Sequence, residues 1–88
     1  MIIWDEDKDQ QLKLERNISF EEISEVILDN KYLDILDHPR KPNQSIFVIE
    51  IKDYIYAVPF VIDENSNIIL KTVYPSRKLY NKYKGGVK

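Results

Sequence analysis

Two β-branched and aromatic runs separated by only two residues constrain the fold of this chain most strongly. The runs are 45–51 (SIFVIEI) and 54–62 (YIYAVPFVI), and only Lys52 and Asp53 connect them. A connection this short lets two strands pair only as an antiparallel hairpin. Pro59 has no N–H to donate, so we expect it on an edge, at a bulge or at the start of a pairing region.

The chain before this hairpin has the spacing of helices. Ser19 and Glu22 form a capping box that begins one helix, which we expect to end near 29–30. Asp5 is placed to cap an earlier helix that runs to about Arg16. The apolar stripe predicted for the later helix consists of Phe20, Ile23, Val26 and Ile27, and the thinner one of the earlier helix of Trp4, Leu12 and Leu14.

The segments around the hairpin indicate a larger sheet. A turn is predicted at 63–67 (DENSN), followed by a third strand at 68–74 (IILKTVY). Two prolines and several polar residues make 37–44 (DHPRKPNQ) a loop. We therefore expect a three- to four-stranded antiparallel meander.

The end of the chain has the signals of a short helix. The stretch 75–83 (PSRKLYNKY) has Ser76 as its N-cap, and Gly85-Gly86 is expected to stop it. The sum is an α+β fold with two N-terminal helices, a meander sheet and a short C-terminal helix. At 88 residues we expect a single domain, 1–88.

Composition excludes several classes of site and location. The chain has no cysteine and a single histidine, which excludes disulfides and argues against a zinc site. The first residues, MIIWDEDKDQ, are acidic where a signal peptide would be basic, and no apolar run approaches membrane-spanning length. We therefore expect a cytoplasmic protein without a metal or cofactor.

Charge divides the chain into two halves. Residues 1–37 carry eleven acidic and four basic side chains, whereas residues 38–88 carry four acidic and nine basic ones. The division favours two working surfaces, one for a polyanion and one for a cationic partner or for solvent. The acidic residues in the first turn of the first helix complement the helix dipole, so their presence needs no functional explanation.

Positive charge and tyrosine are concentrated at the end of the chain. Residues 71–88 contain no acidic side chain, three tyrosines (Tyr74, Tyr80 and Tyr83) and six basic residues, which are Lys71, Arg77, Lys78, Lys82, Lys84 and Lys88. Basic residues interleaved with aromatic rings are typical of proteins that bind single-stranded nucleic acid. The alternative is a solvated amphipathic helix that packs Leu79, Tyr80 and Tyr83 on the sheet.

His38 is the one side chain whose ordinary pKa lies near neutrality, which makes it a candidate acid or base. The alternative is an ordinary exposed loop histidine. Arg40 and Lys41 follow it and form a second small basic patch. No glycine-rich phosphate loop and no Ser/His/Asp spacing point to another kind of catalytic site.

Three short motifs, in order and spacing, resemble the BrnT family of bacterial toxins. They are WDEDK at 4–8, ISFEE at 18–22 and PSRK at 75–78. The resemblance implies a RelE-like ribonuclease fold and the toxin of a type II toxin–antitoxin pair. It also implies a metal-independent endoribonuclease that cleaves RNA and arrests growth or translation.

The resemblance also implies roles for individual residues. Arg77 and Lys78 match the positions that the family associates with RNA cleavage, and we expect Arg77 to stabilise the transition-state phosphate. Tyr80 or His38 is the candidate for proton transfer. The remaining expected RNA contacts are Lys71, Ser76, Lys82, Arg40 and Arg16. Pro75 replaces a serine that is usual in the family, and Glu15-Arg16-Asn17 replaces a usual Lys-His-Gly.

The same resemblance implies partners. We expect RNA as substrate and a cognate BrnA-like antitoxin, which would make the only contacts to DNA. Two alternatives stay open on sequence alone, namely a non-catalytic RNA-binding module and a scaffold that only binds its antitoxin.

Overall fold

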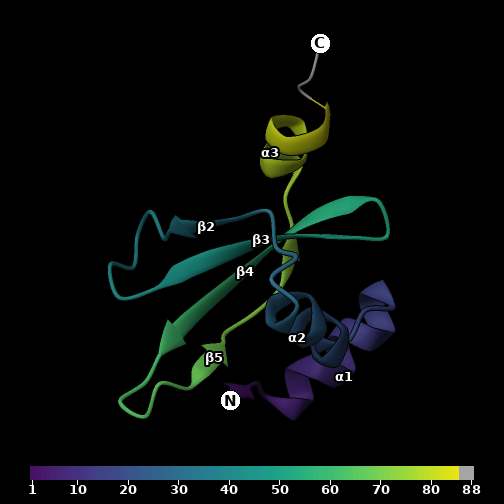
Figure 1. Ribbon diagram of the computed structural model, residues 1–88. Helices are drawn as coiled ribbons and strands as arrows, with labels where there is room; N and C mark the ends of the chain where they lie inside the picture. The colour runs from purple at the N-terminus through teal and green to yellow at the C-terminus, as the bar shows by residue number, and fades with distance from the viewer. Residues whose placement is uncertain (86–88) are drawn as a thin grey trace.

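The computed structural model describes residues 1–85 and shows an α+β fold with helices on both faces of one mixed sheet (Figure 1). In chain order the elements are β1 (Ile2–Ile3), α1 (Glu6–Arg16), α2 (Phe20–Leu28), β2 (Asp34–Asp37), β3 (Ser45–Ile51), β4 (Tyr54–Ile62), β5 (Ile68–Leu70), β6 (Tyr74–Pro75) and α3 (Arg77–Tyr80). A π-helical turn, Asn81–Gly85, continues α3. We call α3 and this turn together the C-terminal helix.

The predicted hairpin is confirmed at the predicted residues. β3 and β4 pair antiparallel from Ser45↔Phe60 to Ile51↔Tyr54. Lys52 and Asp53 connect them with φ angles of 53° and 66°. Positive φ at both central residues is what a type I′ turn requires, and its twist matches the twist of the paired strands. The hairpin is the centre of the sheet, whose order is β1-β5-β4-β3-β2.

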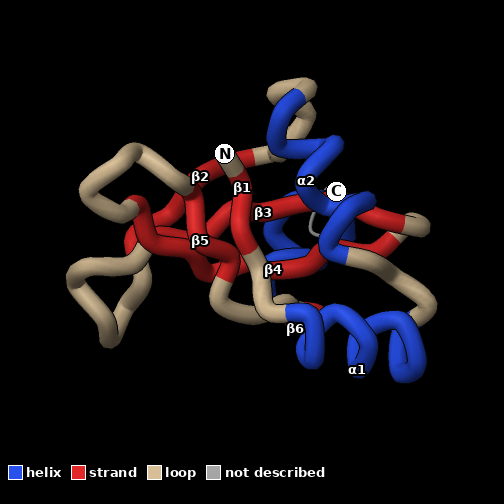
Figure 2. Tube along the Cα trace, turned by 90° about the horizontal axis from the view of Figure 1, so that it is seen from below, coloured by secondary structure: helices blue, strands red, loops and turns tan. Residues whose placement is uncertain are grey.

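The predicted strand count and third strand are wrong. Within residues 1–85 the sheet has six strands, because three short ones join the meander. β1 pairs parallel with β5 (Figure 2), and β2 pairs antiparallel with β3. The stretch predicted as one strand, 68–74, is divided into β5 and β6, which both pair with β4.

Pro59 explains this division. Its carbonyl accepts a hydrogen bond from the N–H of Lys71 at 2.8 Å, so that edge of Pro59 faces the chain between β5 and β6. In an antiparallel ladder the N–H and C=O of one residue point to the same neighbour. The missing N–H of Pro59 therefore faces the interruption, where no ladder bond is required of it.

One face of the sheet is covered by α1 and α2. The capping box of α2 is present, with the Ser19 hydroxyl accepting from the Glu22 N–H at 3.0 Å. As predicted, the α2 stripe packs into the core, together with alternate residues of the hairpin: Phe47, Ile49, Ile51, Tyr56, Val58 and Phe60. The prediction for α1 holds for Leu12 but is wrong for Leu14, which is 87% exposed.

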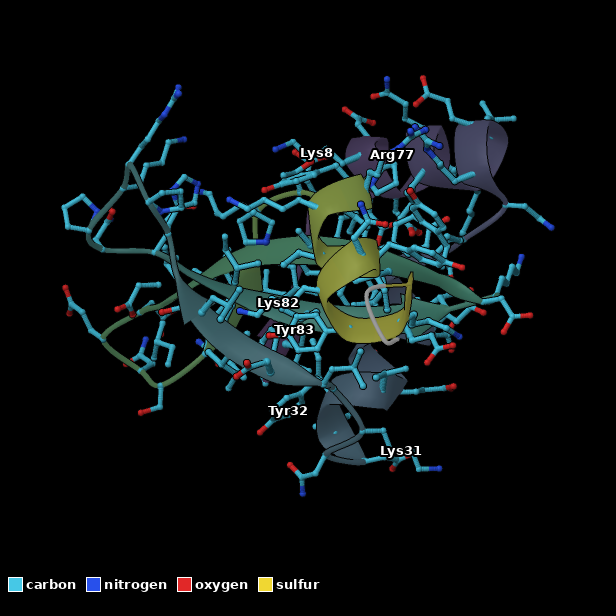
Figure 3. The ribbon with its side chains drawn as sticks, turned by 90° about the horizontal axis from the view of Figure 1, so that it is seen from above. Lys8, Lys31, Tyr32, Arg77, Lys82 and Tyr83 are labelled. Carbon is cyan, nitrogen blue, oxygen red and sulfur yellow. The ribbon has the colours of Figure 1, made fainter. Side chains whose placement is uncertain are left out.

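The C-terminal helix covers the other face (Figures 1 and 3). The intervening residues of the hairpin, Ile46, Val48, Ile55 and Ala57, point to this face and are buried. Ser76 caps α3 as predicted, but Pro75 belongs to β6 and not to the helix. The predicted stop at Gly86 lies outside the described residues.

A buried carboxylate joins α1 to α2. Asp9 is only 4% exposed, and its Oδ1 accepts a hydrogen bond from the backbone N–H of Phe20 at 2.8 Å. Its Oδ2 lies 3.1 Å from the ammonium of Lys13. The same end of α2 is held by Trp4, whose ring stacks on Phe20 with centroids 6.0 Å apart.

We expect Asp9→Ala to lower the free energy of unfolding by about 1–3 kcal/mol, because it leaves the Phe20 N–H buried without an acceptor. Asp7→Ala is the matched control: it removes a carboxylate from the same first turn, where Asp7 is exposed. Urea unfolding measures both. Equal losses in the two variants would show that only helix-dipole charge is at stake.

Candidate nucleic-acid interface

Backbone pairing fixes where the C-terminal helix begins. β6 pairs with β4 at Tyr56↔Pro75, and the N–H of Ser76 donates to the carbonyl of Ile55 at 3.1 Å. The Ser76 hydroxyl then accepts from the N–H of Leu79 at 3.2 Å. Ser76 therefore positions the first turn of α3, and it leaves Arg77 and Lys78 exposed. Among residues 1–85 neither of these two cations has an ion-pair partner.

Arg77 lies beside a pair of stacked tyrosines. The rings of Tyr54 and Tyr80 are 4.8 Å apart between centroids and inclined by 19°. Together with Arg77 and Asn81 they line a hollow of about 390 Å³, which we call the tyrosine hollow. A guanidinium binds phosphate through two parallel hydrogen bonds, and an exposed aromatic ring stacks on an unpaired base. The hollow thus brings together a guanidinium and aromatic rings, two kinds of group that proteins use to bind single-stranded RNA.

Two residues of the basic segment hold the C-terminal helix on the sheet instead of facing solvent. The hydroxyl of Tyr83 donates to Asp34 Oδ2 at 2.7 Å, and the ammonium of Lys84 lies 2.5 Å from Glu50 Oε2. The hydrogen bond from Tyr83 lowers the pKa of Asp34, and the same contact raises the pKa of Tyr83. The carboxylate of Glu50 raises the pKa of Lys84.

The other two lysines predicted to contact RNA, Lys82 and Lys71, lie on different segments. Lys82 extends over the ring of its neighbour Tyr83, with the ammonium 5.4 Å from the centroid. It projects from a different side of the helix than Arg77 does (Figure 3). Lys71 is exposed between β5 and β6, and its carbonyl accepts from the ammonium of Lys8 at 2.7 Å.

His38 and Arg40 lie apart from the tyrosine hollow. The Nδ1 atom of His38 accepts from the backbone N–H groups of Arg40 and Lys41 at 3.1 and 3.2 Å, so the ring caps its own loop. The register places His38 at the Phe60 end of the ladder and Arg77 beside Ile55. Five residues of a strand correspond to about 16 Å, so the two side chains do not meet at one phosphate.

Arg16, the last residue of α1, is not among the residues that line the hollow. Sequence reasoning missed Tyr54 and Asn81, which line the hollow. Tyr54 is a strand residue by pattern, and its position 26 residues before Tyr80 carries no signal that the rings stack.

Residues 1–85 lack two further features that would point to other functions. No group of three or more histidine, aspartate or glutamate side chains is arranged to hold a metal ion. None of the helices described combines the length and apolar character needed to span a bilayer.

We expect Tyr83→Phe to lower stability at neutral pH by removing the hydrogen bond to Asp34. Because folding lowers the pKa of Asp34, the contribution of this carboxylate to the free energy of unfolding is lost as the pH falls below about 4. Because folding raises the pKa of Tyr83, the contribution of its hydroxyl to the free energy of unfolding is lost as the pH rises above about 10. The difference between variant and wild type in urea midpoint should therefore shrink at both extremes.

Tyr74→Phe is the control for this experiment, since Tyr74 is 43% exposed. A pH-independent difference for Tyr83→Phe, or an equal effect of Tyr74→Phe, would contradict the assignment.

Comparison with known proteins gives one informative similarity. No protein-family model matches the sequence, and no curated protein matches it. Among solved structures, the chain resembles the Brucella abortus ribonuclease toxin BrnT, known from a crystal structure at 1.1 Å resolution. The TM-score is 0.60 and the identity 21%, over 85% of this chain and 94% of that one. The resemblance inferred from the three motifs is therefore confirmed at the level of structure, and this chain has the fold of BrnT.

Proposed function

We propose that this protein is a metal-independent endoribonuclease, the toxin of a type II toxin–antitoxin pair. The observation that carries the proposal is Arg77, exposed and without an ion-pair partner in the described chain, beside the stacked rings of Tyr54 and Tyr80. It occurs in a chain with the fold of a ribonuclease toxin. The proposal includes one cytoplasmic domain, 1–88, of the BrnT family within the RelE-like superfamily.

The proposed reaction is an in-line attack by the ribose 2′-oxygen on the adjacent phosphorus. The bond to the 5′-oxygen breaks as the bond from the 2′-oxygen forms; the proton of the 2′-hydroxyl passes to water, and one proton reaches the departing oxygen. Negative charge develops on the phosphate oxygens, where a preorganised guanidinium stabilises the transition state more than the ground state. Arg77 has this role, and Lys78 and Lys71 bind flanking phosphates.

Tyr80 is the proposed proton donor to the departing oxygen. It lines the same hollow as Arg77, whereas His38 uses Nδ1 to cap its own loop and lies at the other end of the ladder. Tyr54 supplies the ring that supports Tyr80 and offers a stacking surface for a base. Apart from Lys71, which lies between β5 and β6, the proposed site consists of residues of the hairpin and of the C-terminal helix.

Partners follow from the resemblance to the family. We propose a cognate BrnA-like antitoxin that neutralises the enzyme and makes any contact to DNA. The second candidate function is a non-catalytic module that binds RNA or the antitoxin. The separation of His38 from Arg77 favours this candidate, because it leaves the hollow with two tyrosines, ordinarily weak acids, as its groups for proton transfer.

Removing the guanidinium tests the proposal most directly. We expect Arg77→Ala to slow RNA cleavage by about 100-fold or more, the usual cost of losing one preorganised donor to a transition-state oxyanion. Cleavage of labelled single-stranded RNA by purified protein, with chelator present, is the measurement. Lys31→Ala is the matched control, because it removes one exposed positive charge from the other side of the molecule (Figure 3). Wild type that retains RNA without cutting it would establish the second candidate function.

A second substitution separates proton transfer from stacking. Tyr80→Phe keeps the ring and removes the hydroxyl, so we expect RNA binding to persist while cleavage falls by about 100-fold, the typical contribution of a positioned acid. Tyr80→Leu should weaken binding as well. Full cleavage by Tyr80→Phe would show that the ring contributes stacking alone.

A further inference from the structure

A cleft lies between α1 and the segment that joins β5 to β6. Its volume is about 190 Å³. It is lined from α1 by Lys8, Gln11, Leu12 and Glu15, and from the other segment by Thr72 and Val73. The α1 residues are three, four and seven positions apart, so they share one face of the helix. We call this space the α1 cleft.

The α1 cleft is apolar where it is deepest and polar at its rim. Phe20 and Leu12, which also line it, are only 1% and 8% exposed, and Val73 packs against the same core. In such a site apolar contacts hold a ligand and a few polar groups fix its orientation. The volume is below the roughly 300–1,000 Å³ of sites for drug-sized ligands, so it suits a single flat ring system.

The polar groups of the rim supply an acceptor and a donor two helical turns apart. The side-chain amide of Gln11 donates to Glu15 Oε2 at 3.1 Å and so orients the carboxylate. A carboxylate accepts up to about four hydrogen bonds, which leaves Glu15 capacity for a ligand. The ammonium of Lys8 donates one of its three hydrogens to the carbonyl of Lys71 at 2.7 Å. The cleft can therefore bind a ring that has donors at one end and acceptors at the other.

We propose that the α1 cleft binds one unpaired guanine base of the RNA and so determines where the RNA is cut. This assignment depends on the proposed function, which makes RNA the ligand. Guanine presents two neighbouring donors, N1–H and the N2 amine, which match the two oxygens of the Glu15 carboxylate. Its O6 and N7 are acceptors of the kind that lysine contacts in nucleic acids, and Lys8 is the donor here.

The carboxylate of Glu15 disfavours the other parts of an RNA chain. It repels a phosphate, which leaves the backbone outside the cleft. Adenine and cytosine place an acceptor ring nitrogen beside their amino group, and uracil flanks its single N–H with two carbonyl oxygens. Each of these bases would bring an acceptor against the carboxylate, whereas guanine offers it two adjacent donors.

The chain itself links the α1 cleft to Arg77. Thr72 lies five residues before Arg77, and an extended chain of that length spans at most about 18 Å. Lys71 is exposed at the start of this stretch. Figure 3 shows Lys8 and Arg77 on the same side of the molecule, away from Lys31. A short stretch of unpaired RNA that follows residues 71–76 around the edge of the sheet therefore reaches from the cleft to the tyrosine hollow.

Oligonucleotides that cannot be cleaved test the cleft apart from catalysis. The probe is a fluorescein-labelled oligouridine with one central guanosine, inosine or adenosine, and 2′-fluoro at every ribose so that no 2′-hydroxyl can attack. Fluorescence anisotropy measures its Kd for the full chain. We expect the guanosine probe to bind about tenfold or more tightly than the adenosine probe, as one bidentate contact discriminates between bases. Inosine, which lacks the N2 amine, should fall between them.

One substitution removes the preference without changing the size of the side chain. Glu15→Gln replaces an acceptor oxygen with a donor amide, so it should bind the guanosine and adenosine probes about equally. Glu25→Gln is the matched control, because Glu25 is an exposed glutamate of α2 outside the cleft, and it should keep the preference. Because both side chains are exposed, each variant should keep the wild-type urea midpoint.

The outcomes separate the guanine subsite from the ribonuclease. Equal binding of the three probes by wild type, or an unchanged preference in Glu15→Gln, would overturn the subsite even if wild type cleaves RNA. Arg77→Ala should bind every probe more weakly and keep the preference. Wild type should cut RNA at a fixed number of nucleotides from a guanosine, and Glu15→Gln should lose this spacing. Selective binding of guanosine without any cleavage would support the subsite and contradict the ribonuclease.

Discussion

The pairing of β4 along both of its edges is the constraint on which the rest of this structure depends. β3 occupies one edge throughout, while the other edge is shared by β5 near Ile62 and by β6 near Tyr56. Pro59 lies where the partner changes, and its missing N–H makes an uninterrupted third strand unfavourable there. The chain therefore leaves the ladder after Leu70 and returns at Tyr74. This return places Ser76 against Ile55 and so starts the C-terminal helix beside Tyr54. A proline in one strand thus determines where an arginine of the next segment is presented.

The concentration of positive charge at the end of the chain has more than one physical cause. Lys84 forms an ion pair with Glu50 that holds the C-terminal helix on the sheet. Lys82 extends over the ring of Tyr83 on the same helix. Arg77 and Lys78 are exposed in the first turn and have no such partner among residues 1–85. A cation already paired with a carboxylate has less to gain from a phosphate than a hydrated one. Within the basic segment, Lys84 is therefore less available to an anion than Arg77 and Lys78 at the start of α3.

What could be predicted from the sequence is what local interactions decide. Ser19 and Glu22 are three residues apart and cap α2 through their own backbone, and Lys52-Asp53 leaves the flanking strands one way to pair. β1 and β6 have only two residues each, too few for an alternating pattern, and exist because β5 and β4 offer open edges. The same limit applies to the candidate site. Arg77 and Ser76 were found from a local motif, but the stacking of Tyr80 on Tyr54 is set by the path of the whole sheet. His38 was a candidate because of its chemical type, and chemical type carries no information about where a side chain lies in the fold.

The two ends of β4 are covered to different extents. The tyrosine hollow is formed by a helix docked on the start of β4, whereas at the end of the same strand Ile62 is exposed beside Leu28 and Ile35. Between these two ends β4 is buried on both faces and pairs with β3 along one whole edge, while Val58 and Pro59 have no strand partner on the other edge. Tyr54 and Ile62 lie at opposite ends of β4, eight residues or about 26 Å apart. A partner bound at Ile62 would therefore act on the hollow directly only through a second segment that reaches Arg77.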